Sequence, residues 1–107
     1  MTTFDKREEA FEKKYVIDED LKFKAVARRN RLLGLWAAEK LGKTGADAEA
    51  YARSVVMSDF EEAGDHDVLR KVQGDLEAAQ IQQSEHQIRR TMDELLARAI
   101  ADIKAGI

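Results

Sequence analysis

The stretch DEDLKFKAVARRNRLLGLWAAEKLG, residues 18–42, decides the fold class. Its three leading acids lie where the dipole of a helix favours negative charge, and Gly42 suits the left-handed residue that often ends a helix. Between these ends, apolar side chains recur at helical spacing. At 100° per residue they share one sector, formed by Leu21, Ala25, Leu32, Leu35 and Trp36 and broadened by Leu33, Ala37 and Leu41. We therefore predict one long amphipathic helix over residues 18–41.

Three further helices follow from the same kinds of signal. Asp47 is the expected N-cap of a second helix over 47–63, with Gly64 as its stop. Asp65 is the expected N-cap of a shorter third helix. Ser84 and Gln87 match a capping box before the last helix. The predicted core residues of the last two helices are Val68, Leu69, Val72 and Leu76, and Ile88, Met92, Leu95, Leu96, Ala99, Ile100 and Ile103.

Composition supports an all-α fold with a single core. The chain has 107 residues, no proline and few strand-type runs, and strong helix formers dominate it. Four helices joined by short loops are typical of a compact bundle. The prediction is a four-helix bundle over residues 18–107, preceded by a separate segment over residues 1–17, which we call the arm.

Charge and residue usage exclude several classes of function. A formal net charge of −3 does not indicate a nucleic-acid or anionic-membrane partner. The absence of cysteine removes disulfides, thiolate catalysis and thiolate metal sites. No apolar run approaches the roughly 20 residues of a membrane span, and a signal peptide is not apparent. We expect a cytoplasmic protein that does not insert into a membrane and is a monomer when free.

The arm has an unusual pattern, because it is helix-like but has little to bury. On a helical wheel its aromatic residues form one narrow seam, with Phe11 and Tyr15 within about 20° of Phe4. Basic side chains lie on one flank of the seam and acidic side chains on the other. The predicted binding residues of the arm are Phe4, Arg7, Glu8, Phe11, Glu12, Lys14 and Tyr15.

Two interpretations of the arm stay open on these grounds. The seam is too thin for a core helix, and an isolated helix of this length is marginal in water. The arm therefore suits a flexible, conditionally helical segment that folds when it is laid into a groove. The alternative is a fraying extension of the first bundle helix, with its aromatic residues packed loosely on the bundle.

Other candidate motifs are weak. Residues 37–44 match a relaxed phosphate loop, but an amphipathic helix precedes them where a strand is needed. His66 and His86 follow helix N-caps and lack a Glu three residues earlier, so solvated histidines are expected and no metal site. With no cysteine and no recognisable catalytic set, we predict that the chain is not an enzyme and needs no cofactor.

Residues 22–31 carry five bases and no acid, and would suit RNA or an acidic protein surface. The bases spread around the helix, however, and only one aromatic residue accompanies them. A solvated helix with local acidic partners is the simpler interpretation, and an acidic protein is the expected partner if the region binds one. The candidates for this secondary contact are Lys22, Lys24, Arg28, Arg29 and Arg31.

Several stretches resemble the zeta subunit of bacterial F-type ATP synthases. They are MTTFDKREEAFE, FKAVARRNRLLGLWAAEKLG and IRRTMDELLARA, and the resemblance covers essentially the whole chain. It implies a four-helix inhibitor of ATP hydrolysis whose N-terminal segment is flexible when free. That segment is taken to insert as a helix at a catalytic α/β interface of the synthase and to reach towards the rotor. The implied partners are the alpha, beta and gamma subunits, which would hold the protein peripherally at the inner membrane.

Two rival functions remain at this stage. A helical adaptor would bind another protein through the arm or the basic helix. A nucleotide-binding regulator would use Lys43 and its surroundings. An RNA-binding role would require an affinity that falls steeply with salt.

Overall fold

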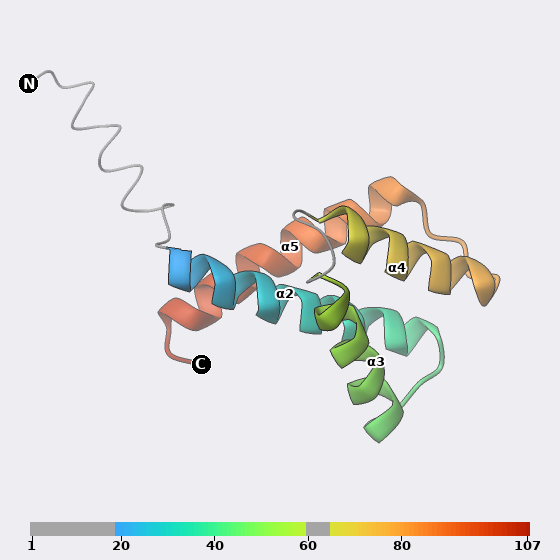
Figure 1. Cartoon of the computed structure of the whole chain (residues 1–107), viewed down its shortest axis with the longest axis horizontal. Helices are drawn as coiled ribbons and strands as arrows, with labels where there is room; N and C mark the ends of the chain where they lie inside the picture. Colours follow the sequence, from blue (N-terminus) through green and yellow to red (C-terminus); the bar gives the residue numbers. More distant parts are fainter. Residues whose placement is uncertain (1–18, 60–64) are drawn as a thin grey trace, which may run out of the picture.

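The computed structural model describes residues 19–59 and 65–107. Within these ranges the chain forms four α-helices and no strand, which confirms the all-α prediction (Figure 1). The helices are α2 (Glu19–Lys40), α3 (Gly45–Ser58), α4 (His66–Ala78) and α5 (Glu85–Lys104). The arm and the predicted end of the second helix, residues 60–63 with Gly64 as stop, lie outside the described residues.

Helix α2 is the centre of the bundle and packs against α3, α4 and α5. It runs antiparallel to α5, so the start of α2 lies near the end of α5 (Figure 1). Apolar residues of all four helices form the core between them, and Trp36, Leu41, Tyr51, Ile81 and Leu95 pack against it. The core residues are Leu33, Ala37, Val55, Val68, Leu69, Val72, Leu76, Ile88 and Met92.

The end of α2 is the predicted left-handed cap. Gly42 has φ +77°, and its N–H donates to the carbonyl of Glu39 at 3.1 Å. The next amide, of Lys43, donates to the carbonyl of Ala38 at 2.8 Å. This pair of reversed hydrogen bonds is a Schellman motif, which satisfies carbonyls that the last helical turn leaves free.

The start of α3 differs from the prediction. The helix begins at Gly45, and Thr44 is its N-cap, with extended φ and ψ of −137° and 163°. Asp47, the predicted N-cap, lies in the first turn, where a negative charge also favours a helix. The N-cap prediction was wrong because Thr44 leaves the helical conformation first, and its carbonyl accepts from the amide of Asp47 at 3.1 Å.

The caps of α4 and α5 match the sequence signals. Asp65 precedes α4 as predicted, although its side chain makes no capping hydrogen bond. Ser84 and Gln87 form the predicted capping box, in which the Ser84 amide donates to Gln87 Oε1 at 3.0 Å and the Gln87 amide donates to Ser84 Oγ at 3.1 Å. The capping box acts within three residues and forms as predicted, whereas the Asp65 carboxylate accepts a hydrogen bond from Arg29 of α2 and does not cap α4.

The buried face of α2 is rotated from the predicted sector. Leu32, Leu35 and Trp36 are only partly buried, whereas Arg29, Asn30, Gly34 and Ala38 are buried along with the predicted Ala25, Leu33 and Ala37. A helix with neighbours on several sides needs a wider buried face than its apolar stripe suggests.

Gly34 explains how α3 approaches α2 so closely. A Cβ added at residue 34 would lie 2.5 Å from the Cα of Ala52 on α3 and 3.1 Å from its Cβ. Ala52 is itself buried. The two helices therefore cross at a point where only a hydrogen on one backbone and a methyl on the other fit between them.

Candidate functional site

The predicted primary site, the seven arm residues from Phe4 to Tyr15, lies outside the described residues. The structure therefore adds no geometry to it. It does describe where the bundle presents the secondary candidates, all of which come from the first half of α2.

Three of the α2 bases lie on the open surface. Lys22 is exposed. Lys24 is 3.1 Å from Asp20 one turn earlier, and the two form an exposed i,i+4 ion pair. Arg31 crosses to α3, where its Nη2 donates to both carboxylate oxygens of Glu49 at 2.9 and 3.0 Å. These contacts agree with a solvated helix whose bases find local acidic partners.

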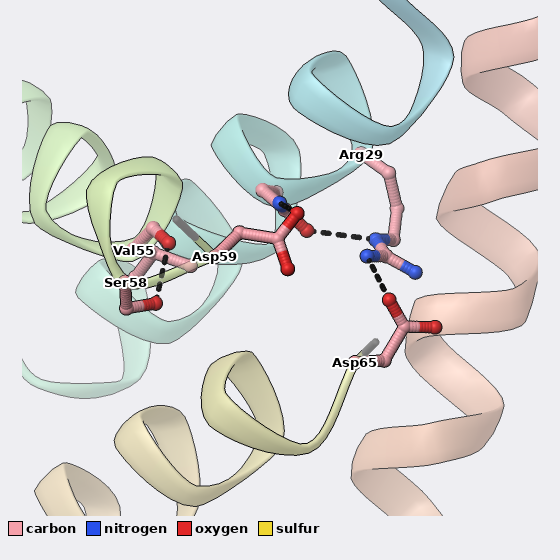
Figure 2. Close-up of polar contacts among 6 residues, drawn as sticks. Arg29, Val55, Ser58, Asp59 and Asp65 are labelled. Carbon is pink, nitrogen blue, oxygen red and sulfur yellow. Dashed lines mark hydrogen bonds and ion pairs between the residues drawn. The ribbon is translucent and has the colours of Figure 1, made fainter. Parts of the chain in front are cut away.

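Arg29 lies in a different environment, because its side chain is only 2% exposed. Its Nη2 donates to Oδ1 of Asp65 at 2.8 Å, and its Nε donates to Oδ1 of Asn30 at 2.9 Å. Figure 2 shows Arg29 reaching from α2 towards Asp65, which stands at the start of α4. The guanidinium is occupied inside the bundle, so it is not available as an open-surface contact.

Asn30 extends this cluster to the end of α3. Its Nδ2 donates to Oδ2 of Asp59 at 3.1 Å. Asp59 is the C-cap of α3, and Asp65 is the N-cap of α4. Adjacent residues of α2, Arg29 and Asn30, therefore bind the two ends of the α3–α4 connection. We call Arg29, Asn30, Asp59 and Asp65 the polar clamp.

The clamp has a clear electrostatic effect. The hydrogen bond from Arg29 lowers the pKa of the Asp65 carboxyl from its ordinary value, and this effect outweighs the partial burial that would raise it. The charges of Arg29, Arg89 and His66 act in the same direction. Asp65 is therefore ionised at neutral pH and balances the charge of a buried arginine. The clamp does structural work and has no geometry that indicates catalysis.

The sequence held a signal for Arg29 that the basic-helix interpretation missed. Arg29 follows Ala25 by four residues and precedes Leu33 by four, so it lies on the row of the buried face. An arginine in such a row needs a buried acceptor. The signal for its partner was absent, since Asp65 lies 36 residues away.

An open groove lies beside the exposed side of α2. Its larger hollow, of about 530 Å³, is lined by Ala27, Arg28, Arg31, Leu32, Val56, Asp102 and Ile107. A smaller one beside it shares two of these residues and is lined by Phe23, Val26, Ala27, Asn30, Val56 and Asp59. We call the two together the α2 groove. It joins α2, α3 and the end of α5, and has both apolar and charged walls.

Arg28 is the notable residue of this groove. Its Nη1 is buried from solvent and has no hydrogen-bond partner among the described residues. Phe23, which lines the smaller hollow, is 62% exposed, and Ile107, which lines the larger one, is 75% exposed. The groove therefore combines uncovered apolar surface with an unsatisfied donor. Another hollow, of about 650 Å³, surrounds the α4–α5 turn and contains no predicted site residue.

The remaining motifs have structural roles. Residues 37–44 form the end of α2, its cap and the turn into α3, so a helix stands where a phosphate loop has its strand. His66 and His86 are exposed in the first turns of α4 and α5, as expected. The parts of the chain that the structure describes contain no group of three or more His, Cys, Asp or Glu that could hold a metal ion. They also contain no helix both long and apolar enough to span a bilayer.

The described residues thus form a small helical bundle with a structural polar clamp and an open groove of mixed character. The comparisons with known proteins identify its family. A model of the family "ATPase inhibitor subunit zeta" matches residues 1–102, and the chain belongs to that family. The resemblance stated from the sequence is thereby confirmed.

A solved structure supports the fold. A protein studied by solution NMR is 49% identical in sequence, and the match covers 81% of this chain and 99% of that one with a TM-score of 0.71. Among curated proteins, none matches the chain. The four-helix arrangement is therefore shared with a protein whose structure was determined experimentally.

Proposed function

We propose that the chain inhibits ATP hydrolysis by a bacterial F-type ATP synthase by inserting the arm, residues 1–17, as a helix at a catalytic α/β interface near the rotor. The single observation that carries this proposal is the family match, which begins at residue 1 and so includes the whole arm. The partners would be the alpha, beta and gamma subunits, on the cytoplasmic side of the inner membrane.

The arm's own pattern supports a binding role. Phe4, Phe11 and Tyr15 would anchor the helix, because buried aromatic side chains are frequent anchors at the hot spots of protein interfaces. The flanks, Arg7 with Lys14 and Glu8 with Glu12, would set its orientation by charge complementarity. Such a wedge needs no chemistry of its own, since it only has to stop the interface from changing shape.

The bundle, residues 18–107, would serve as the dock that limits how far the arm enters. Its four packed helices and the polar clamp would hold together the body that carries the arm. The arm contains no histidine, so protonation of a histidine within it is not the release signal.

The test is a titration of ATP hydrolysis by a matching catalytic head. Wild-type protein is compared with the variant Phe4→Ala, Phe11→Ala, Tyr15→Ala. We expect the variant to lose at least about 2 kcal/mol of binding, or roughly thirtyfold in inhibitory affinity. Glu9→Ala is the matched arm control, because residue 9 lies well away from the aromatic seam on the wheel.

The outcomes separate the candidate functions. Equal inhibition by the wild type and the triple variant would move the inhibitory surface to the bundle. Absence of inhibition by the wild type itself would favour a helical adaptor with another partner. Circular dichroism of each variant shows whether the helices of the bundle are retained.

A further inference from the structure

The α2 groove leaves apolar surface uncovered. Phe23 and Ile107 are mostly exposed although each lines one of its two hollows. Val26, Ala27 and Val56 also line the groove and are only partly buried. Apolar side chains that are gathered along one groove, unlike those scattered singly over a surface, are typical of a site that another molecule covers.

The charges of the groove indicate the chemistry of its occupant. Arg31 and Asp102 each form an ion pair with another residue of the bundle. Asp59 accepts a hydrogen bond from Asn30. The Nη1 atom of Arg28, by contrast, is buried without a hydrogen-bond partner among the described residues. Because a carboxylate is the acceptor that suits a guanidinium best, the occupant needs an acidic group as well as apolar side chains.

The length of the groove suits a helix. Its α2 wall runs from Phe23 to Leu32, which is about 14 Å along the helix axis. A second helix laid along this wall would make about two and a half turns over that distance. Helices that bind in apolar grooves use side chains at positions i, i+3 or i+4 and i+7, and two and a half turns contain such a set.

We propose that the groove binds an amphipathic helix of the synthase's catalytic head, which presents apolar side chains to the groove walls and a carboxylate to Arg28. This inference rests on the proposed function, because it takes the catalytic head as the partner. It goes further in giving the bundle a contact of its own, made by α2, α3 and the end of α5.

The position of the groove favours this partner. Phe23 lies about 6 Å along the helix axis beyond Glu19, where the first described segment begins. A partner that binds residues 1–17, as proposed above, is thereby kept close to the groove. The groove contact is then intramolecular, at an effective concentration on the order of millimolar for a short connection. A contact that is weak by itself therefore adds to the total affinity.

The walls favour a protein helix over a small anion. An anion alone would satisfy Arg28 and would leave Phe23 and Ile107 in water. A second copy of the chain would bring apolar surface too, but it would have to reach the groove by diffusion, without a tether.

A photo-crosslinker beside the groove tests the contact in the full-length protein. The chain has no cysteine, so Lys24→Cys creates a single attachment point for a benzophenone. Residue 24 is exposed, lines neither hollow and lies on the face of α2 that carries Ala27, Arg28 and Arg31. After irradiation with the catalytic head, we expect a cross-link to a helix of the head that carries acidic and apolar residues. Gln82→Cys, at an exposed position of the α4–α5 turn, is the control and should give none.

Substitutions within the groove make the test specific. Arg28→Ala removes the unpaired donor, and Phe23→Ala removes exposed apolar surface. Each should lower the cross-link yield from residue 24 at a limiting concentration of the head and weaken inhibition, in each case by about tenfold. Phe23 is mostly exposed, so its truncation should leave the fold intact, and circular dichroism checks both variants. Lys22→Ala, at an exposed residue of the same helix that lines neither hollow, should change neither readout.

Other results would overturn the proposal. Cross-links from residue 24 that survive both groove substitutions would show proximity without a groove contact. Equal cross-linking from residues 24 and 82, or none from residue 24, would place the head elsewhere. A product of twice the mass of the chain, formed without the head, would assign the groove to a second copy.

The two readouts separate this inference from the proposed function. Inhibition by the wild type without a groove cross-link leaves the function standing and removes the groove contact. A groove cross-link that depends on Arg28 and Phe23, without inhibition, leaves the contact standing and removes the function. The absence of both removes both.

Discussion

The guanidinium of Arg29 on α2 and the carboxylate of Asp65 at the start of α4 lie 2.8 Å apart, and Arg29 is almost fully buried while Asp65 is half exposed. The charge of the buried Arg29 guanidinium is thus balanced by a half-exposed carboxylate at the start of α4. Removing that acid would leave a buried cation without its counter-ion, which is the costly way to break an ion pair.

Asp65→Asn should therefore destabilise the protein by about 2 kcal/mol. This is less than the roughly 3–5 kcal/mol of a fully buried pair, because water screens the exposed half of Asp65. Urea unfolding followed by circular dichroism measures the change. Asp20→Asn, which breaks the exposed pair with Lys24, is the control and should change stability by no more than about 0.5 kcal/mol. Equal losses of unfolding free energy in both variants would show that the burial of Arg29 does not strengthen its ion pair with Asp65.

The same pair predicts a dependence of stability on acid. The pKa of Asp65 is lowered below its ordinary value of 3.8, so the unfolded chain takes up the proton at a higher pH than the folded one. The stability from this carboxylate is therefore present above pH 3.8 and is lost as the pH falls through the lowered pKa. The difference in unfolding free energy between wild type and Asp65→Asn should shrink as the pH is reduced through this range. A difference that is constant with pH would contradict the assignment.

Gly34 and Gly74 should respond to alanine with opposite signs. At Gly34 the new Cβ would lie 2.5 Å from the Ala52 backbone, so α2 and α3 must move apart, at a cost of about 1–3 kcal/mol. At Gly74 nothing lies within 4 Å, and alanine should stabilise α4 by up to about 1 kcal/mol. Thermal and urea unfolding of the two variants check this contrast. Stabilisation by Gly34→Ala would mean that the helices are not in close contact there.

Gln80 adopts a left-handed conformation that suits glycine better. Its φ is +60°, and among the described residues it is the only one other than glycine with a positive φ. It ends α4 in a Schellman motif, in which the amide of Ile81 donates to the carbonyl of Leu76 at 2.9 Å. Gln80→Gly should stabilise the protein by up to about 1 kcal/mol, because the Cβ strain outweighs the entropy that glycine adds to the unfolded chain. Gln82→Gly, where φ is not positive, should give no such gain, and a higher urea midpoint for Gln80→Gly alone would support the assignment.

Local signals predicted the helices well, whereas the binding residues of the arm stay a prediction. The cap at Gly42 and the capping box of Ser84 with Gln87 each act within a few residues, and both are present as predicted. The start of α3 was misplaced by two residues, since Thr44 and Asp47 both suit a helix start and local chemistry alone does not choose between them. The aromatic seam of the arm is a prediction from the helical period, and it stays one.

The sequence by itself determined the all-α class, the number and approximate bounds of the described helices, and the family, because all of these depend on composition, periodicity and motifs along the chain. Only the tertiary structure decided that Arg29 and Asn30 are buried in a clamp, that Gly34 lies against Ala52, and that Arg28 borders a groove shared with α3 and α5. These facts depend on which helices meet and at what rotation. A helix's own pattern limits that rotation only to a broad sector, and its partners, tens of residues away in the chain, choose the angle within it.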